Sequence, residues 1–191
     1  ASTILKSGAD ELAVACADEA IQLRKNGFGV PILILGNTSS DMASDLIKYD
    51  IMPCVYNTDF AEYLSKEAAL QGKTAKIHIK IDTGMGRIGF LYDDSPANRA
   101  AAINDILRIS MLPNIKIEGM FTHFATSDEA DDTYTHMQFE RFTNLAAKLE
   151  EIGISIPSKH VCNSAAIMRF PEMQLDMVRA GVIMYGMYPS E

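Results

Sequence analysis

The chain alternates short apolar segments with longer amphipathic ones, and this alternation limits its possible folds more than any other feature. Helical periodicity is clearest in one stripe, which Gly153 ends: Phe142, Leu145, Ala146, Leu149 and Ile152. Strand–helix units that repeat along one chain predict parallel strands joined by right-handed crossovers. Seven short segments are the predicted strands, at residues 11–16, 31–35, 51–56, 77–81, 115–122, 159–162 and 177–180.

Two architectures have this order of elements, an open doubly wound sheet and a closed (β/α)8 TIM barrel. An open sheet that binds a dinucleotide carries a GxGxxG motif after its first strand, and no early strand here is followed by one. A barrel instead collects functional residues at the carboxyl ends of several strands. We therefore predict an α/β fold of the TIM-barrel type. Residues suited to such a site lie near or just after the ends of four predicted strands: Lys80, Arg87, His123, Asn163, Ser164 and Arg179.

The length predicts an incomplete barrel. A TIM barrel has eight strands and typically about 250 residues, whereas this chain has 191 residues and seven predicted strands. Its first residues, ASTILKSGA, have the pattern of the last turns of an amphipathic helix closed by Gly8. We therefore expect strands 2 to 8 of a barrel, in a single domain over residues 1–191 that is truncated at both ends.

Composition argues against several classes of partner. Acidic residues give a net charge of -8 and no basic run occurs, so we expect no nucleic acid and no anionic membrane surface as a partner. No apolar segment is long enough to span a bilayer, and no secretory signal pattern is present. Cys16, Cys54 and Cys162 have no paired spacing, and we interpret them as reduced core thiols of a cytoplasmic protein.

The segment KIDTGMGRIGF combines the end of a strand with a glycine-rich turn. Alternation places the three isoleucines of residues 77–81 on one face and Lys80 on the other, which predicts that Lys80 points into the interior. A buried lysine needs a counter-charge, a lost proton or a chemical modification. The three glycines of the turn allow a sharp bend or close approach to a ligand, and Arg87 lies among them as a permanently charged donor.

Two later segments favour an anion site. In HVCNSAA, Asn163 and Ser164 follow a short strand, where a hydroxyl and backbone N–H groups can converge on an anion; an ordinary helix N-cap is the alternative. In MVRAG, Arg179 lies within an apolar segment and Gly181 follows it. Because the loops after strands seven and eight of a TIM barrel form its usual phosphate site, the two segments together indicate an anion.

The histidines differ in their surroundings. His123 ends a predicted strand, and a satisfied core residue and a catalytic residue are equally compatible with that position. We interpret His78 and His160 as supporting residues and His136 as a surface residue. The sequence contains no metal-ligand spacing and no GxSxG elbow, so we predict neither a metal site nor a serine hydrolase.

Six segments together resemble alanine racemase, in order and over essentially the whole chain: ELAVACADEAIQLRKNG, PILILG, KIDTGMGRIGF, GMFTHFATSDE, HVCNSAA and MVRAGVIMYG. The resemblance implies a pyridoxal 5'-phosphate (PLP) dependent isomerase with a barrel domain followed by a β-rich domain. It further implies a cytoplasmic homodimer that interconverts L- and D-alanine and supplies D-alanine for cell-wall peptidoglycan.

The resemblance also implies roles for individual residues. Arg87 matches an arginine that contacts the cofactor phenolic oxygen and the region of the substrate carboxylate. Lys80 matches a lysine that is often carbamylated, whose carbamate holds that arginine. His123 matches a histidine beside the pyridine ring. Arg179 matches an arginine that donates to the pyridine nitrogen, with His160 behind it.

The remaining matches surround the cofactor. Asn163 and Ser164, with the backbone of Gly181 and Val182, match the contacts on the phosphate side. Leu35 matches a residue that lines the cofactor pocket.

Two elements of the family have no counterpart in this sequence. The lysine that binds PLP lies near the end of the family's first barrel strand, and the opposing catalytic tyrosine lies in its β-rich domain. Racemisation needs a base on one face of the α-carbon and an acid on the other, so we predict no catalytic residue within the chain. We expect the chain alone to be inactive, with PLP absent or bound weakly without a covalent link. The alternatives are a non-catalytic PLP-carrier barrel protein and a racemase for serine or another amino acid.

Overall fold

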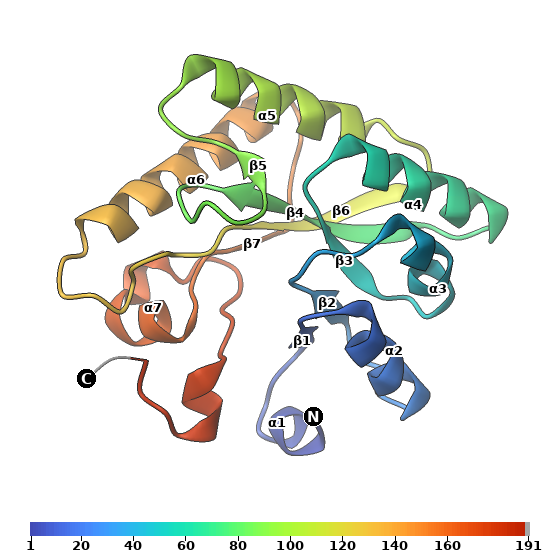
Figure 1. Cartoon of the computed structure of the whole chain (residues 1–191), viewed down its shortest axis with the longest axis horizontal. Helices are drawn as coiled ribbons and strands as arrows, with labels where there is room; N and C mark the ends of the chain where they lie inside the picture. Colours follow the sequence, from blue (N-terminus) through green and yellow to red (C-terminus); the bar gives the residue numbers. More distant parts are fainter. Residues whose placement is uncertain (190–191) are drawn as a thin grey trace. The chain divides into compact units, whose positions relative to one another are not determined.

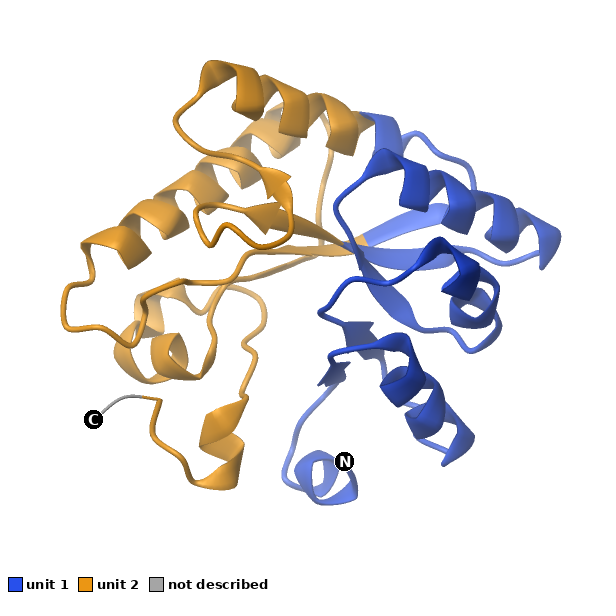
Figure 2. Cartoon of the chain, in the orientation of Figure 1, with its two compact units in different colours: residues 1–78, 108–117 blue, residues 79–107, 118–191 orange. Residues whose placement is uncertain are grey.

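The computed structural model describes residues 1–189, and the chain forms two compact units (Figure 2). Unit 1 comprises residues 1–78 and 108–117, and unit 2 comprises residues 79–107 and 118–191. The strand β4 (Ala75–Asp82) begins in the first unit and ends in the second. Whether the chain acts as one domain stays a prediction.

Unit 1 alternates short strands with helices, as the sequence predicted (Figure 1). The strand β2 is buried along its whole length and pairs in parallel with strands on both sides. Burial on both faces explains why β2 reads as a continuous apolar run. The elements before β4 are α1 (Ser2–Lys6), β1 (Leu12–Val14), α2 (Ala17–Lys25), β2 (Ile32–Ile34), η1 (Ser40–Met42), α3 (Ala43–Lys48), β3 (Met52–Val55) and α4 (Thr58–Leu70).

The ends of the unit 1 helices follow local signals. Gly8 has a positive φ angle of 101° and follows α1, which confirms it as a helix stop, and Gly27 follows α2 in the same way with a φ angle of 83°. The N-cap of α2 is Cys16, and Asp18 lies in the first turn, where its charge favours the helix dipole. Cys16 is exposed, which also corrects its assignment to the core.

Unit 2 contains the longer helices and the segments that carry most of the predicted site. Its helix α6 buries the predicted stripe at Phe142, Leu145 and Leu149, whereas Ile152, the C-cap residue, is 48% exposed. The elements that lie wholly or mainly in unit 2 are β5 (Phe90–Leu91), α5 (Pro96–Ser110), β6 (Ile115–Phe121), α6 (Thr133–Glu151), β7 (Ser158–His160), α7 (Ser164–Arg169), η2 (Pro171–Met173) and η3 (Val182–Tyr185).

The hydrogen-bonded strand order follows the chain, β1-β2-β3-β4-β6-β7, with β5 paired only to β4. The strand pairs run parallel, for example Leu12 opposite Ile32 and Phe121 opposite His160. A doubly wound sheet reverses its strand order at a switch point, whereas neighbouring strands of a (β/α) barrel are consecutive in sequence. The predicted α/β fold of an incomplete barrel is therefore confirmed.

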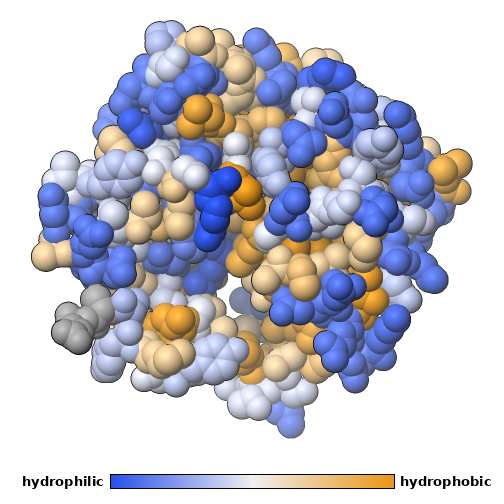
Figure 3. Space-filling view, in the orientation of Figure 1, coloured by the Kyte–Doolittle hydropathy of each residue, from blue (hydrophilic) through white to orange (hydrophobic). Residues whose placement is uncertain are grey.

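One predicted strand is wrong. Residues 177–180 form an extended segment that is not a strand, although the backbone N–H of Arg179 donates to the Cys162 carbonyl at 3.0 Å. A second such bond joins the N–H of Asp176 to the Lys159 carbonyl at 3.1 Å. These two hydrogen bonds, both to residues 159–162, do not form the regular ladder of hydrogen bonds that defines a strand. Several large side chains of this segment, of η3 and of the residues after η3 are exposed: Val178, Val182, Met184, Tyr185, Met187 and Tyr188. Figure 3 shows hydrophobic and hydrophilic residues side by side on one face of the chain.

Among residues 1–189, no helix is both long enough and apolar enough to cross a membrane.

Candidate active site

The end of β4 carries a lysine into the interior of unit 2. Lys80 is 2% exposed, and the isoleucines that alternate with it are fully buried, so the predicted inward orientation of Lys80 is confirmed. Its Nζ donates to the Ile81 carbonyl at 3.2 Å and lies 5.0 Å from the centroid of the Phe121 ring. A cation over an aromatic face is stabilised by the ring quadrupole.

The glycine-rich turn is shaped by the carboxylate of Asp82. Its Oδ1 accepts hydrogen bonds from the N–H groups of Gly84 at 3.0 Å and Gly86 at 3.1 Å. At Gly89, φ is +140° and a Cβ atom would lie 2.3 Å from the Asp82 nitrogen, so a side chain has no room there. The close approach predicted for these glycines is therefore to the chain's own backbone at Gly89. The turn leaves Arg87 exposed to solvent.

An aromatic stack joins the ends of β6 and β7. Phe121 and His160 are register partners, and their rings stack with centroids 4.8 Å apart and an interplanar angle of 7°. The guanidinium of Arg179 lies over the Phe121 ring at 5.3 Å. Phe121 thus contacts both Arg179 and Lys80, although the two cations come from segments about a hundred residues apart.

Four acceptors hold the guanidinium of Arg179. Nη1 lies 2.6 Å from Nδ1 of His160 and donates to the His160 carbonyl at 3.0 Å, and Nη2 donates to the carbonyls of Thr122 at 2.8 Å and Val161 at 3.0 Å. Because a guanidinium only donates, Nδ1 of His160 is the acceptor and its ring proton lies on Nε2. Burial lowers the pKa of Arg179 to about 10, so it stays charged at neutral pH.

His123 is a neutral imidazole in this environment. Burial lowers its pKa to about 3, and the positive charges of Arg179, Lys80 and Arg87 act in the same direction. The joint action of these three cations on one ring indicates that the predicted residues of β4, β6 and the segment after β7 face a common region of unit 2. An anion would find a favourable potential there.

The predicted anion segment shows both a cap and an inward hydroxyl. Asn163 is the N-cap of α7, with its Oδ1 accepting from the N–H of Ala166 at 3.0 Å and from the hydroxyl of Ser127 at 2.9 Å. Ser164 is buried, and its Oγ accepts from the N–H of Gly181 at 3.0 Å. Ser164 and Gly181 are therefore side by side. Phosphate binding by this group, with Val182 next in the chain, stays a prediction.

Leu35 belongs to unit 1, where it follows β2 and its N–H donates to the Val14 carbonyl at 2.9 Å. Its place in the cofactor pocket stays a prediction. Within residues 1–189, no group of three or more His, Cys, Asp or Glu side chains is arranged to hold a metal ion.

Sequence reasoning missed two residues that organise the site. Phe121 contacts Lys80, His160 and Arg179, yet in sequence it is one more apolar residue of a strand. Gln138 is fully buried in the middle of α6. A polar residue at a core-facing position of the α6 periodicity is the signal that could have found it.

Consecutive parallel strands in hydrogen-bonded order define this chain as an incomplete α/β-barrel domain. The chain belongs to the family of alanine racemase N-terminal domains, whose family model matches residues 1–189.

Individual relatives agree with this assignment. An alanine racemase of Clostridium perfringens is 51% identical over 191 residues, which cover 100% of this chain and 48% of that protein. Among solved structures, alanine racemase of Clostridium difficile in complex with cycloserine has a TM-score of 0.94 and 43% identity, over 100% of this chain and 50% of that one. A histidine racemase from Leuconostoc mesenteroides has a TM-score of 0.87 and 28% identity, over 99% and 49% of the two chains. The chain thus spans about half the length of the relatives that it matches.

Proposed function

We propose that the protein containing this chain is a PLP-dependent alanine racemase, an isomerase that interconverts L- and D-alanine. Family membership over residues 1–189 and 51% identity to an alanine racemase support the proposal. Further parts of the proposal, taken from the family, are a homodimer, a cytoplasmic location and a role in supplying D-alanine for the cell wall. The observation that carries the proposal is the guanidinium of Arg179, which four acceptors hold in place without any carboxylate among them.

The residues present fit PLP through their charge. The cofactor carries a phosphate and a phenolic oxygen, and the cations that surround His123 suit an anion of this kind. When bound, PLP supplies an electron sink that stabilises negative charge at the substrate α-carbon. The proposed holders on the phosphate side are Asn163, Ser164, Gly181 and Val182, and Leu35 is proposed to line the pocket.

Arg179 would tune that chemistry by keeping its own proton. With a pKa of about 10, it would donate a hydrogen bond to the pyridine nitrogen of bound PLP and keep its own proton at neutral pH. An unprotonated pyridine would be a weaker electron sink than a pyridinium, which would favour return of a proton over side reactions. His160 accepts from Arg179 and, with its ring stacked on Phe121, keeps the guanidinium in place.

Lys80 and Arg87 are proposed to act as a pair. A buried ammonium is costly, and carbamylation would turn it into an anion that accepts from Arg87. Arg87 would then face the substrate carboxylate and the phenolic oxygen in a set orientation. His123 would stay neutral beside the ring because burial lowers its pKa to about 3, and the charges of Arg179 and Arg87 act in the same direction.

The test uses the whole protein with PLP. We expect it to racemise L- and D-alanine, and we expect Arg179→Glu to divert part of the turnover to transamination, because a carboxyl partner can share a proton with the pyridine. Arg169→Glu serves as a charge-matched control, since Arg169 donates to backbone carbonyls of the loop after β6 and does not contact His160. Absence of amino-acid racemisation would overturn the proposal. An unchanged ratio of transamination to racemisation in Arg179→Glu would overturn the role of Arg179.

A racemase for another amino acid is the second candidate. The histidine racemase of Leuconostoc mesenteroides has this fold at 28% identity, so related barrels act on a different side chain. Turnover of alanine, serine and histidine at equal concentrations distinguishes the candidates. A PLP-carrier protein is the third alternative, and it would bind PLP but racemise none of the three.

A further inference from the structure

One face of α6 presents three polar side chains to the loops that carry the site. Tyr134, Gln138 and Arg141 are separated by four and three residues, the spacing that places side chains on the same face of a helix. The apolar residues of α6 already attach the helix to the core of unit 2, so these polar contacts add to packing that exists without them.

Gln138 uses its amide to join two segments. Its Nε2 donates to the Thr83 hydroxyl at 3.2 Å and to the His123 carbonyl at 3.1 Å, while its Oε1 accepts from the N–H of Ala125 at 2.8 Å. Thr83 in turn shares a hydrogen bond of 2.8 Å with the hydroxyl of Thr122. Gln138 is 0% exposed, so no water replaces these partners if the amide is removed.

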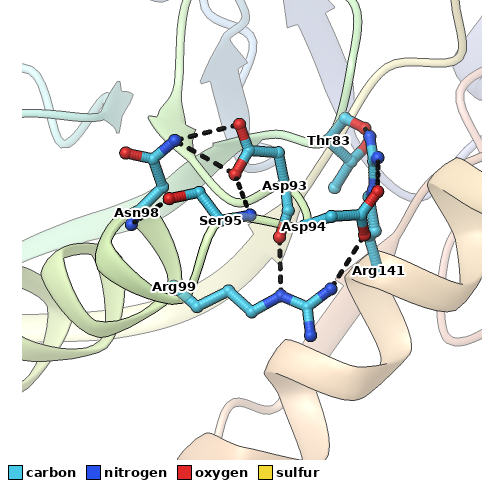
Figure 4. Close-up of polar contacts among 7 residues, drawn as sticks. All are labelled: Thr83, Asp93, Asp94, Ser95, Asn98, Arg99 and Arg141. Carbon is cyan, nitrogen blue, oxygen red and sulfur yellow. Dashed lines mark hydrogen bonds and ion pairs between the residues drawn. The ribbon is translucent and has the colours of Figure 1, made fainter.

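The two flanking residues hold the glycine-rich turn. The hydroxyl of Tyr134 donates to the Gly84 carbonyl at 2.7 Å. Arg141 donates from Nη1 to the Thr83 carbonyl at 2.9 Å and from Nη2 to Oδ2 of Asp94 at 2.5 Å, which Figure 4 shows as a bridge between the turn and the start of α5. The bonds to the carbonyls of Gly84 and Thr83 reach the stretch just before Arg87.

We propose that Gln138 is a positioning residue, which sets the turn that carries Arg87 relative to the loop that carries His123. Tyr134 and Arg141 anchor the same turn from the adjacent turns of α6. The side-chain hydrogen bonds of all three residues are to the loops that carry Arg87 and His123 and to Asp94. Their effect is to hold Arg87 and His123 in one arrangement while PLP and substrate bind. The catalytic consequence rests on the proposed function, whereas the coupling of the two loops does not.

The first experiment measures the coupling between the two loops and does not depend on enzyme activity. In the whole protein, amide hydrogen exchange is followed in Gln138→Met, which keeps the volume and removes the three bonds, and in Leu149→Val, a core change further along the same helix. We expect exchange at Ala125 and at residues 84–89 to be at least about 10-fold faster in Gln138→Met than in Leu149→Val, after both are compared at equal global stability. Equal exchange at these amides in the two variants would overturn the proposal.

The second experiment measures the consequence for turnover. We expect Gln138→Met to lose about 10- to 100-fold in kcat/KM for alanine, with part of the loss in kcat, because small misplacements of Arg87 and His123 raise the barrier. Leu149→Val should keep both constants within about 2-fold of the parent. Wild-type kinetics in Gln138→Met would overturn the positioning role, whereas a wild-type protein that racemises no amino acid would overturn the proposed function and leave the exchange result standing.

Tyr134→Phe tests the same idea without risk to the fold, because Tyr134 is 40% exposed and loses one hydroxyl. We expect faster exchange at residues 84–89 and unchanged exchange at Ala125, since only the turn loses an anchor. Tyr63→Phe, on the exposed face of α4 in unit 1, is the matched control. Unchanged exchange at residues 84–89 in Tyr134→Phe would contradict the anchoring by Tyr134.

Discussion

Phe121 and His160 are register partners on neighbouring parallel strands, and their rings stack with an interplanar angle of 7°. Both rings also contact cations. Lys80 and Arg179 lie over the Phe121 ring, and Arg179 donates a hydrogen bond to His160. The stack therefore supports both cations of the site. Cation–aromatic contacts of this kind are worth up to about 2 kcal/mol when water is excluded.

Phe121→Leu should therefore lower the free energy of unfolding by more than the lost packing alone would. The substitution removes the stack on His160 and the aromatic face under Lys80 and Arg179, and we expect about 2–4 kcal/mol lower stability by urea unfolding. Phe142→Leu is the matched control, a fully buried phenylalanine in α6 for which no cation contact is seen among the described residues. An equal loss in the two variants would show that the cations draw no support from Phe121.

The pKa of His123 predicts a pH-dependent stability. The group titrates near its ordinary pKa of 6.5 when unfolded and at about 3 when folded, so the unfolded chain binds the extra proton between these values. Stability should consequently fall as pH drops from about 6.5 towards 3, and His123→Gln should flatten the curve in that interval. Urea unfolding at several pH values measures this slope, and identical slopes with and without the histidine would contradict the depressed pKa.

Gly89→Ala should distort the turn that carries Arg87. Its Cβ would lie 2.3 Å from the Asp82 nitrogen at a φ of +140°, so we expect a loss of about 3 kcal/mol or more, or a failure to fold. Gly86→Ala is the control, with φ of +70° and nothing within 4 Å of the added atom. That change should cost only about 1–2 kcal/mol in thermal unfolding. A larger loss in Gly86→Ala than in Gly89→Ala would show that the close contact at residue 89 does not exist.

PLP added to the 191-residue chain should bind weakly and without a covalent link. The family's PLP-binding lysine motif does not occur in the sequence, whereas the buried hydroxyl of Ser164 lies beside the N–H of Gly181. We expect no borohydride-trappable absorbance near roughly 420 nm, and weaker binding of PLP in Ser164→Ala than in the exposed control Ser155→Ala. A strong trappable band on a lysine of this chain would contradict the expectation.

Much of the fold could be predicted because burial leaves a local record in the sequence. The strand β2 is buried along its whole length and reads as an apolar run, and the stripe of α6 repeats with the helical period. The inward direction of Lys80 follows from the same alternation, since neighbouring side chains of a strand point to opposite faces. The segment at 177–180 is also mostly apolar, but it is not a strand. Its backbone hydrogen bond to the segment after β7 does not extend into a regular ladder, and composition does not reveal whether such a ladder forms.

The sequence by itself thus determined the order of strands and helices, the interior position of Lys80 and the motifs shared with alanine racemases. Only the tertiary structure decided which side chains meet. Phe121 lies beside His160 because of the register of β6 and β7, and Gln138 reaches Thr83 and His123 because of the rotation of α6. Such contacts join residues 15 to 55 positions apart, so they depend on how elements pack and not on any local pattern.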